Sequence, residues 1–448
     1  MAQVLFQLPK ELLVHTLSFL QPDELASSFG LHELLYADDG DPFTQIRQLA
    51  LWAKYLDRNV AMSNNVFEGL NQLDLLHLKY LIKYNILIRP KEISFVLFDF
   101  TNYAGSYKYF EVINTYYLEY LKKFTDCFSI QLILVENVEI DNYLVKSMFE
   151  PFNLNNFKIN WFTIKYLPNS MTGNQQFDFE DLNDRNAEYR INDFLKNNDG
   201  LMVENLKLHL FSSNNLLHHL RNDPSSDNAC FYCNSLKTID FSYNNLKDDD
   251  LQNINFPQLL EYLNLSNNNL CFLLNHNFNL TCLMNLKVLN ISNNNIMQFN
   301  FNTNHLPSDH NYQLEHLDLS GNNLTDYQDL FKTNNLFFKN LISIDLSRNL
   351  ISKLSSFPSL LKRINLNGNH LSNFIKELNG EIFPKNLLEL YISFCRIVGE
   401  KNLYPLFISH LIFEENLFKL RLLEITGGAI DYSNFHSKST LPLHLQVL

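Results

Sequence analysis

An eleven-residue pattern at positions 314–324 limits what this chain can fold into more than any other feature. Its apolar residues stand at places one, four, six and eleven, with an asparagine at place nine. That spacing fits neither an amphipathic helix nor a simple alternating strand. Leu317, Asp318 and Leu319 alternate as a short strand does. Asn322 then predicts a tight turn, because its side chain can bond backbone groups that a turn leaves unpaired.

The pattern recurs along the second half of the chain. Further copies begin at Leu236, Leu260, Leu286, Leu341, Leu361, Leu387 and Leu420. Five of these seven keep Asn at the turn position, and Cys395 and Gly428 replace it in the last two. Starts lie between 20 (361−341) and 33 (420−387) residues apart, and most fall in the range of about 20–29 residues typical of leucine-rich repeats. The array resembles that family, which implies a curved parallel sheet in a horseshoe.

Looser copies of the pattern precede the regular array and lack the turn asparagine. They begin at Ile93, Ile130, Ile159 and Val203, with starts 29 (159−130) to 44 (203−159) residues apart. Longer repeats have room for a helix on the outer face, and helix-like stretches lie between them, at 107–124, 141–149 and 179–197. We therefore expect long helix-bearing repeats first and short repeats afterwards.

The N-terminal stretch 8–25 contains two helix starts, each opened by a proline, which suits the first helical turn because its missing N–H would be unpaired there anyway. One interpretation is a helical cap for the open end of the repeat array. The stretch also resembles an F-box, whose pattern is matched by Leu8-Pro9, Glu11, the run 17–20 and Pro22. The resemblance fades after residue 25, because 26–35 contains Gly30 and no Lys or Arg.

The F-box resemblance implies contact with the Skp-type adaptor of a cullin–RING ubiquitin ligase. Carried over by position, the adaptor-binding residues would be Leu8, Pro9, Leu12, Leu17, Leu20 and Pro22. The expected fold is an α/β leucine-rich-repeat solenoid preceded by this helical F-box-like segment. We divide the chain into the F-box-like segment (1–56), a helical lead-in capping the solenoid (57–92), long degenerate repeats (93–235) and regular short repeats (236–448).

Composition and charge narrow the class of partner. A net charge of −13 makes nucleic acid or an anionic membrane surface an unsuitable main partner. Residues 1–20 lack the basic region of a secretory signal, and no apolar run approaches the roughly 20 residues that span a bilayer. Cys230 and Cys233 form a single CxxC without the second pair that metal sites of this kind need. We therefore expect a cytoplasmic or nuclear protein with no metal and no cofactor.

Side chains between the inward leucines of each repeat strand should face the concave surface. Asp318 and Asp345 belong to a polar stripe there, although Asp or Asn before Leu-Ser is also ordinary filler in this repeat. Large residues stand at the ends of the arc, where aromatic and Arg side chains are the usual interface anchors. These partner-binding candidates are Trp161, Tyr166, Tyr391, Phe394 and Arg396.

Catalytic motifs are missing from the sequence: it has no Gly-rich phosphate loop, no HExxH and no GxSxG. We therefore expect a protein that is not an enzyme. Two functions remain open. One is the substrate-recognition subunit of an F-box ubiquitin ligase, with a target protein on the concave face. The other is a leucine-rich-repeat scaffold or signalling-binding protein whose N-terminal helices act only as a cap.

Overall fold

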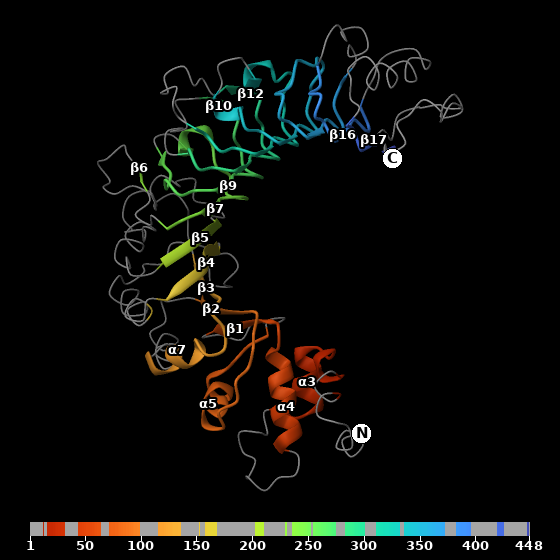
Figure 1. Ribbon diagram of the computed structural model, residues 1–448. Helices are drawn as coiled ribbons and strands as arrows, with labels where there is room; N and C mark the ends of the chain where they lie inside the picture. Colours follow the sequence, from red (N-terminus) through yellow and green to blue (C-terminus); the bar gives the residue numbers. More distant parts are fainter. Residues whose placement is uncertain are drawn as a thin grey trace, which may run out of the picture. The chain divides into compact units, whose positions relative to one another are not determined.

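The computed structural model describes a set of segments that form two compact units, Met1–Lys207 (the first unit) and Leu208–Leu448 (the second unit). Figure 1 shows their helices and strands. The described residues are 12, 16–31, 44–63, 71–98, 115–135, 152, 157–167, 202–209, 229–230, 235–251, 254–274, 283–300, 311–331, 336–371, 382–395, 419–424 and 446–447.

The α-helices whose bounds the structure describes all belong to the first unit. They are α3 (Pro22–Ser28), α4 (Thr44–Tyr55), α5 (Leu75–Lys83) and α7 (Thr115–Leu121). Pro22 opens α3 as predicted, and the Glu24 carboxylate accepts a hydrogen bond from the Gln21 N–H at 2.8 Å. Asp74 caps α5 by accepting from the His77 N–H at 2.7 Å. The N-termini of α3 and α5 are thus fixed by side chains that accept hydrogen bonds from otherwise unpaired backbone amides.

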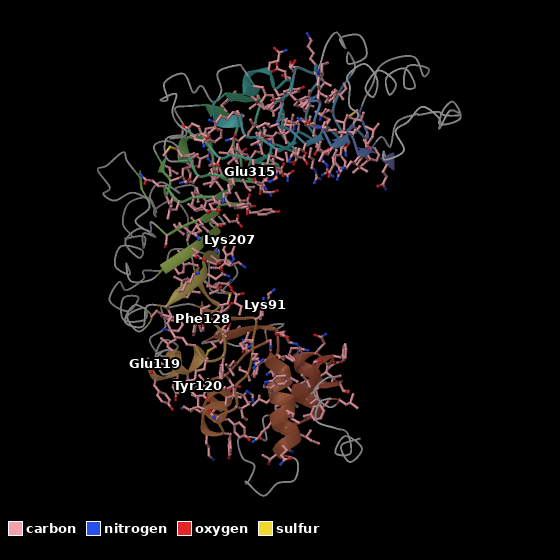
Figure 2. All side chains as sticks on the ribbon, viewed as in Figure 1. Lys91, Glu119, Tyr120, Phe128, Lys207 and Glu315 are labelled. Atoms are coloured by element: carbon pink, nitrogen blue, oxygen red, sulfur yellow. The ribbon has the colours of Figure 1, made fainter. Side chains whose placement is uncertain are left out.

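Parallel strands make up the sheet of the first unit. In spatial order they are β1 (Asn59–Ser63), β2 (Glu92–Phe98), β3 (Phe128–Val135), β4 (Lys158–Leu167) and β5 (Met202–His209). The last four lie at the starts of the four loose repeats, so those predicted strands are confirmed. Phenylalanine fills the space behind them: the Phe95 ring lies 5.0 Å from Phe152 and the Phe128 ring lies 4.7 Å from Phe157, between centroids. Figure 2 labels Phe128 within this unit.

The segment 57–92 differs from the helical lead-in that we predicted, because it contains β1. This strand pairs in parallel with β2, from Asn59 beside Glu92 to Ser63 beside Val96. Its other edge is covered by the following chain: the Ala61 N–H donates to Asn71 O at 2.9 Å, and the Leu73 N–H donates to Ala61 O at 2.8 Å. The sheet therefore begins one strand earlier than the leucine spacing indicated, and its first edge is not left open for another chain.

The second unit is an array of very short parallel strands. In spatial order they are β7 (Thr238–Asp240), β9 (Tyr262–Asn264), β11 (Val288–Asn290), β13 (His316–Asp318), β14 (Ser343–Asp345), β15 (Arg363–Asn365), β16 (Glu389–Tyr391), β17 (Leu422–Glu424) and β18 (Gln446–Val447). From β7 to β17 the central residue of each strand is buried, and its neighbours are mostly half-exposed. We call the side that those neighbours face the open face. Each regular repeat thus contributes one strand, as the sequence predicted.

The turn asparagines join consecutive repeats of the second unit. The Asn322 side chain donates to the carbonyls of Leu319 in its own repeat and Ile291 in the preceding one, each at 3.0 Å. Its oxygen accepts from the Ile296 N–H at 3.1 Å. Asn268, Asn294, Asn349 and Asn369 donate to carbonyls in the same way. These amides replace the ladder hydrogen bonds that the chain loses when each strand ends.

The outer side of the second unit has no long helix in the part that the structure describes. It carries the 3-10 helices η3 (Asp248–Leu251), η5 (Gln328–Phe331) and η6 (Leu336–Phe338), and the parallel strand pairs β6 (Ala229–Cys230) with β8 (Ile254–Asn255) and β10 (Phe272–Leu274) with β12 (Gln298–Asn300). Short repeats leave too few residues for a helical return. The expectation of short repeats with irregular outer segments is therefore confirmed where the structure describes them.

Candidate protein-interaction surfaces

Two arginine side chains anchor the N-terminal segment to the rest of the first unit through bonds to backbone carbonyls. The Arg58 guanidinium donates to Ser18 O at 3.2 Å and also to Leu20 O. Arg47 Nε donates to Phe29 O at 3.3 Å. Because Arg58 immediately precedes β1, these bonds fix the end of the first predicted helix against the start of the sheet. An anchored segment of this kind can present side chains in a defined orientation.

The predicted adaptor-binding residues have different environments. Leu12 is 53% exposed, whereas Leu17 is buried within the unit. Leu20 and Pro22 are half-buried, and Leu8 and Pro9 lie outside the described residues. Leu17 thus packs inside this unit, while Leu12 faces outward.

Phe19 is a surface residue that the sequence analysis did not single out. It is 71% exposed, more than any other large apolar side chain in the described part of the chain. It stands in the matched run 17–20, where Leu17 is buried and Leu20 half-buried. Leu17 and Leu20 are three residues apart and share one helical face, so the helical period already leaves Phe19 off that face.

The acidic stripe of the open face is mostly engaged with its own backbone. Asp318 Oδ1 accepts from the Ser320 N–H, and Asp345 Oδ1 accepts from the Ser347 N–H, each at 2.9 Å. Asn365 donates to the other oxygen of Asp345 at 2.7 Å. Burial raises the pKa of the Asp318 carboxyl, and the bonds from Ser320 oppose that shift. These aspartates therefore shape the strand exit, and what they offer a partner is limited.

The late aromatic candidates occupy two different positions. Tyr391 lies on the open face, with its hydroxyl donating to Glu389 Oε2 at 3.0 Å and the Arg363 guanidinium 5.1 Å from its ring centre. Arg363 Nε also lies 3.5 Å from Glu389 Oε2. Phe394 stands at the strand exit and is 65% exposed. Arg396 lies outside the described residues.

The backbone at Phe394 adds a second observation. Its φ is +56°, the left-handed region that bulky side chains rarely occupy. The same turn place has positive φ in six other repeats, at Tyr243, Asn267, Asn293, Gly321, Arg348 and Gly368. Glycine and asparagine accept this conformation at little cost, whereas phenylalanine does not. Tyr243 and Arg348 share this conformation, so the repeat imposes it, and at Phe394 it holds an exposed aromatic ring at the strand exit.

The early candidates are described in part. Trp161 is half-buried in β4 and lies beside Ser129 in the sheet register. The backbone N–H of Trp161 donates to Ser129 Oγ at 3.3 Å. The backbone of Tyr166 pairs with that of Leu134, and its side chain lies outside the described residues. Trp161 and Tyr166 belong to the first unit, whereas the late candidates belong to the second.

A cavity of about 380 Å³ lies in the first unit, lined by Thr125, Asp126, Cys127, Lys158, Asn160 and Glu204. Lys158 Nζ lies 3.1 Å from Glu204 Oε1, so these two charges neutralise each other. Burial raises the pKa of the Cys127 thiol, which keeps it protonated and weakly nucleophilic.

The described residues can be searched for metal-binding clusters and for membrane-spanning helices. Among them, no three His, Cys, Asp or Glu side chains gather in a way that could ligate a metal ion. Cys233 of the CxxC pair lies outside these residues. None of the described helices combines the length and apolar character needed to cross a bilayer.

Comparison with known proteins identifies the repeat. Residues 313–333 match the family model Leucine Rich Repeat. Over 185 residues the chain is 30% identical to Protein PAC2 of Saccharomyces cerevisiae, an alignment that covers 40% of this chain and 31% of the relative. The chain therefore spans about a third of the length of the curated relative that it matches.

Solved structures with similarity include a leucine-rich repeat protein from Bacteroides eggerthii (14% identity, 85% of this chain and 62% of that chain, TM-score 0.36). The mouse RP105/MD-1 complex is 16% identical, with 83% of this chain and 57% of that chain covered and a TM-score of 0.40. YopM from Yersinia enterocolitica is 16% identical, with 84% of this chain and 78% of that chain covered and a TM-score of 0.29. The leucine-rich-repeat fold itself follows from the parallel strand register and the asparagine bonds between repeats.

Proposed function

We propose that this chain is a binding subunit without chemistry of its own, which holds a target protein on its repeat sheet and docks on a Skp-type adaptor through its N-terminal segment. In that role it would act in a cullin–RING ubiquitin ligase, in the cytoplasm or nucleus. Leucine-rich-repeat proteins bind partners through extended sheet surfaces, and the strands of the second unit leave half-exposed side chains along such a surface.

The exposure of Leu12 and Phe19 is the observation that carries the adaptor half of the proposal. Two large apolar side chains at the surface of one short segment cost solvation free energy, of the order of 25 cal/mol for each Å² left in water. Arg58, at the start of the sheet, holds this segment through Ser18 O, and Arg47 of α4 holds Phe29 O at the end of α3, so the pair is presented from an anchored support. Exposed apolar groups on an anchored element are typical of protein docking sites.

The adaptor half can be tested by co-purification of the full chain with a purified Skp-type adaptor. Changing Leu12→Ala together with Phe19→Ala should reduce adaptor capture at least about tenfold, since burial of each side chain at an interface is worth about 1.5–3 kcal/mol. Leu8→Ala with Pro9→Ala should act in the same direction. Circular dichroism of each variant should match that of the unchanged chain.

A matched control comes from the same unit. Leu76 and Leu87 are 54% and 47% exposed and lie outside the N-terminal segment. Leu76→Ala with Leu87→Ala should leave adaptor capture within about twofold of the unchanged chain. If the unchanged chain captures no adaptor, or if both double variants lose it equally, the alternative scaffold function is favoured and the N-terminal helices act as a cap.

A further inference from the structure

The residues that precede the strands of the second unit form a single row. Each is hydrogen-bonded through its backbone to its counterpart in the preceding repeat; for example, the Leu388 N–H donates to Lys362 O and the Arg421 N–H to Leu388 O, both at 2.8 Å. In spatial order the row is Lys237, Glu261, Lys287, Glu315, Ile342, Lys362, Leu388 and Arg421. Neighbouring strands in a sheet are about 4.8 Å apart, so adjacent side chains in this row can interact directly.

The first half of the row neutralises itself. Lys237, Glu261, Lys287 and Glu315 alternate in sign, and Lys287 Nζ lies 2.8 Å from Glu261 Oε2. The Glu261 carboxylate raises the pKa of Lys287. Figure 2 labels Glu315, the last member of this alternating half. A charged partner would therefore meet a surface of low net charge here.

The second half of the row is different, because its charged members are both basic. Lys362 and Arg421 are exposed, and three more exposed bases stand beside them on the same strand entries. We call this set the basic edge: Lys362, Arg363, Lys385, Lys419 and Arg421. Lys419 Nζ is held by a neutral group, Asn386 Oδ1, at 2.6 Å.

Carboxylates near the basic edge are already occupied. Among the described residues of β15–β17 and their entries these are Glu389, bound to Arg363 and Tyr391, and Glu424, whose Oε1 accepts from Ser393 Oγ at 3.1 Å. Five exposed basic residues thus stand on three neighbouring strand entries, in a chain whose net charge is −13. Like charges on neighbouring strand entries repel one another, and a bound anion would relieve that repulsion.

We infer that the basic edge binds an acidic segment of a partner protein, an extended stretch that carries at least three carboxylates. Three strand entries span about 10 Å, roughly the length of three extended residues. Arg363, stacked on the Tyr391 ring, is preoriented to offer its remaining N–H groups to a carboxylate. The inference specifies the partner chemistry for the target-binding half of the proposed function and does not depend on adaptor docking.

A polypeptide fits this surface better than a nucleic acid does. Asp345, Glu389 and Glu424 lie on the strands beside the basic edge and would repel a continuous phosphate backbone. Side chains alternate along an extended peptide, so an acidic peptide can direct some carboxylates at the strand entries and turn the others away from those strands. Its affinity should fall as salt concentration rises, because all five bases are exposed.

The test uses the full chain and a fluorescein-labelled octaglutamate peptide, with binding followed by fluorescence anisotropy. Lys362→Glu with Arg421→Glu should weaken binding at least about tenfold. The control carries the same charge change elsewhere in the unit: Lys237→Glu with Lys247→Glu, both at exposed positions, should stay within about twofold. The Lys362/Arg421 variant should also bind labelled octalysine more tightly than the unchanged chain does, a gain that a misfolded variant would not give.

Three results would overturn the inference. These are octaglutamate binding no tighter than that of a neutral Gly-Ser octapeptide, an equal loss of affinity in the control variant, and tighter binding of a single-stranded oligonucleotide through Lys362 and Arg421. If adaptor capture persists in the same preparation, such a failure counts against the basic edge alone. If adaptor capture fails and octaglutamate binding persists, the fault lies with the adaptor half.

Discussion

At the scale of single residues, the turn asparagines account for most of what the sequence predicted correctly. The repeat pattern alone placed Asn244, Asn268, Asn294, Asn322 and Asn349 at turns, because an amide is the side chain that can both donate and accept there. Their bonds reach the preceding repeat as well as their own. The spacing of the leucines does not predict the bond to the preceding repeat, because that bond forms only when the repeats stack.

Asn322→Ala should be strongly destabilising. The side chain is buried, makes three donor contacts with carbonyls and accepts one backbone N–H, so the change leaves several buried polar groups unpaired. We expect a loss of about 2–4 kcal/mol in the free energy of unfolding of the second unit. Urea unfolding followed by far-UV circular dichroism measures it. Asn323→Ala, at the half-exposed neighbouring position, is the control and should cost under about 1 kcal/mol.

Cys395 occupies the turn position that holds asparagine in the preceding regular repeats, so introducing Asn there should not destabilise the unit. Its Sγ donates weakly to Leu366 O at 3.3 Å and to Ser393 O at 3.7 Å. Cys395→Asn should therefore be neutral or stabilise the unit by up to about 1 kcal/mol, whereas Cys395→Ala should destabilise it. The urea midpoints of the two variants test this prediction. A clear loss of stability in the Cys395→Asn variant would show that this repeat does not share the turn geometry of the preceding ones.

Residues with special backbone conformations were harder to predict. Gly321 and Gly368 suit a left-handed turn, and the sequence places them at the same repeat position as Phe394 and Tyr243. A bulky side chain gives no local sign that it adopts positive φ, since its own preference is against it. The conformation is set by the repeat, and it becomes visible only by alignment with the glycine-containing copies.

At the scale of elements, the regular strands were predictable and β1 was not. Asn59–Ser63 contains no Leu-x-Leu spacing, and its three central residues are all buried, so it lacks the alternation that marks a strand with one exposed face. What defines it is pairing with β2 on one side and the 71–73 segment on the other. Such an element depends on tertiary context.

Aromatic stacking connects repeats on the outer side of the second unit. The Tyr327 ring lies 4.7 Å from that of Phe357, which lies 5.7 Å from that of Phe383, in both cases nearly parallel. The Tyr327 hydroxyl donates to Ser355 O at 2.8 Å and accepts from the Ser355 N–H at 2.9 Å. Burial raises the pKa of Tyr327, because a phenolate inside this cluster would lose its hydration.

Tyr327→Phe should change both the stability and its pH dependence. Near pH 7 the loss of the Ser355 bonds should cost about 1–2 kcal/mol. Since the folded pKa is raised, the tyrosine's contribution is present below about pH 10, the ordinary pKa, and is lost as pH rises above it, where the unfolded chain releases the proton more readily. The variant should therefore show a shallower loss of stability between pH 9 and 11. Urea midpoints across that range check it, and identical slopes would contradict the assignment.

At the scale of the whole molecule, the two units provide separate spectroscopic signals. The chain has two tryptophans, Trp52 and Trp161, and both belong to the first unit. Repeats interact mainly with their nearest neighbours, and long arrays lose all-or-none cooperativity. The domain boundaries that we drew from the sequence, at 56, 92 and 235, follow motif changes, whereas the compact units divide between Lys207 and Leu208.

Asn322→Ala should consequently shift the circular dichroism transition of the chain more than its tryptophan fluorescence transition. The substitution lies in the second unit, and the fluorescence reports on the first. A fluorescence midpoint within about 0.3 M urea of the unchanged chain is expected, given an ordinary slope of about 1–3 kcal/mol per M. Equal shifts of both signals would mean that the two units unfold as one.

The central claim is that one chain carries an anchored docking segment at its N-terminus and a separate partner surface on its repeats. Hydrogen exchange of the full chain, with and without a saturating Skp-type adaptor, tests it most directly. We expect adaptor binding to protect only peptides covering 8–31 and to leave exchange in the strands of the second unit unchanged. Absence of any protection, or protection on those strands and none at 8–31, would contradict it.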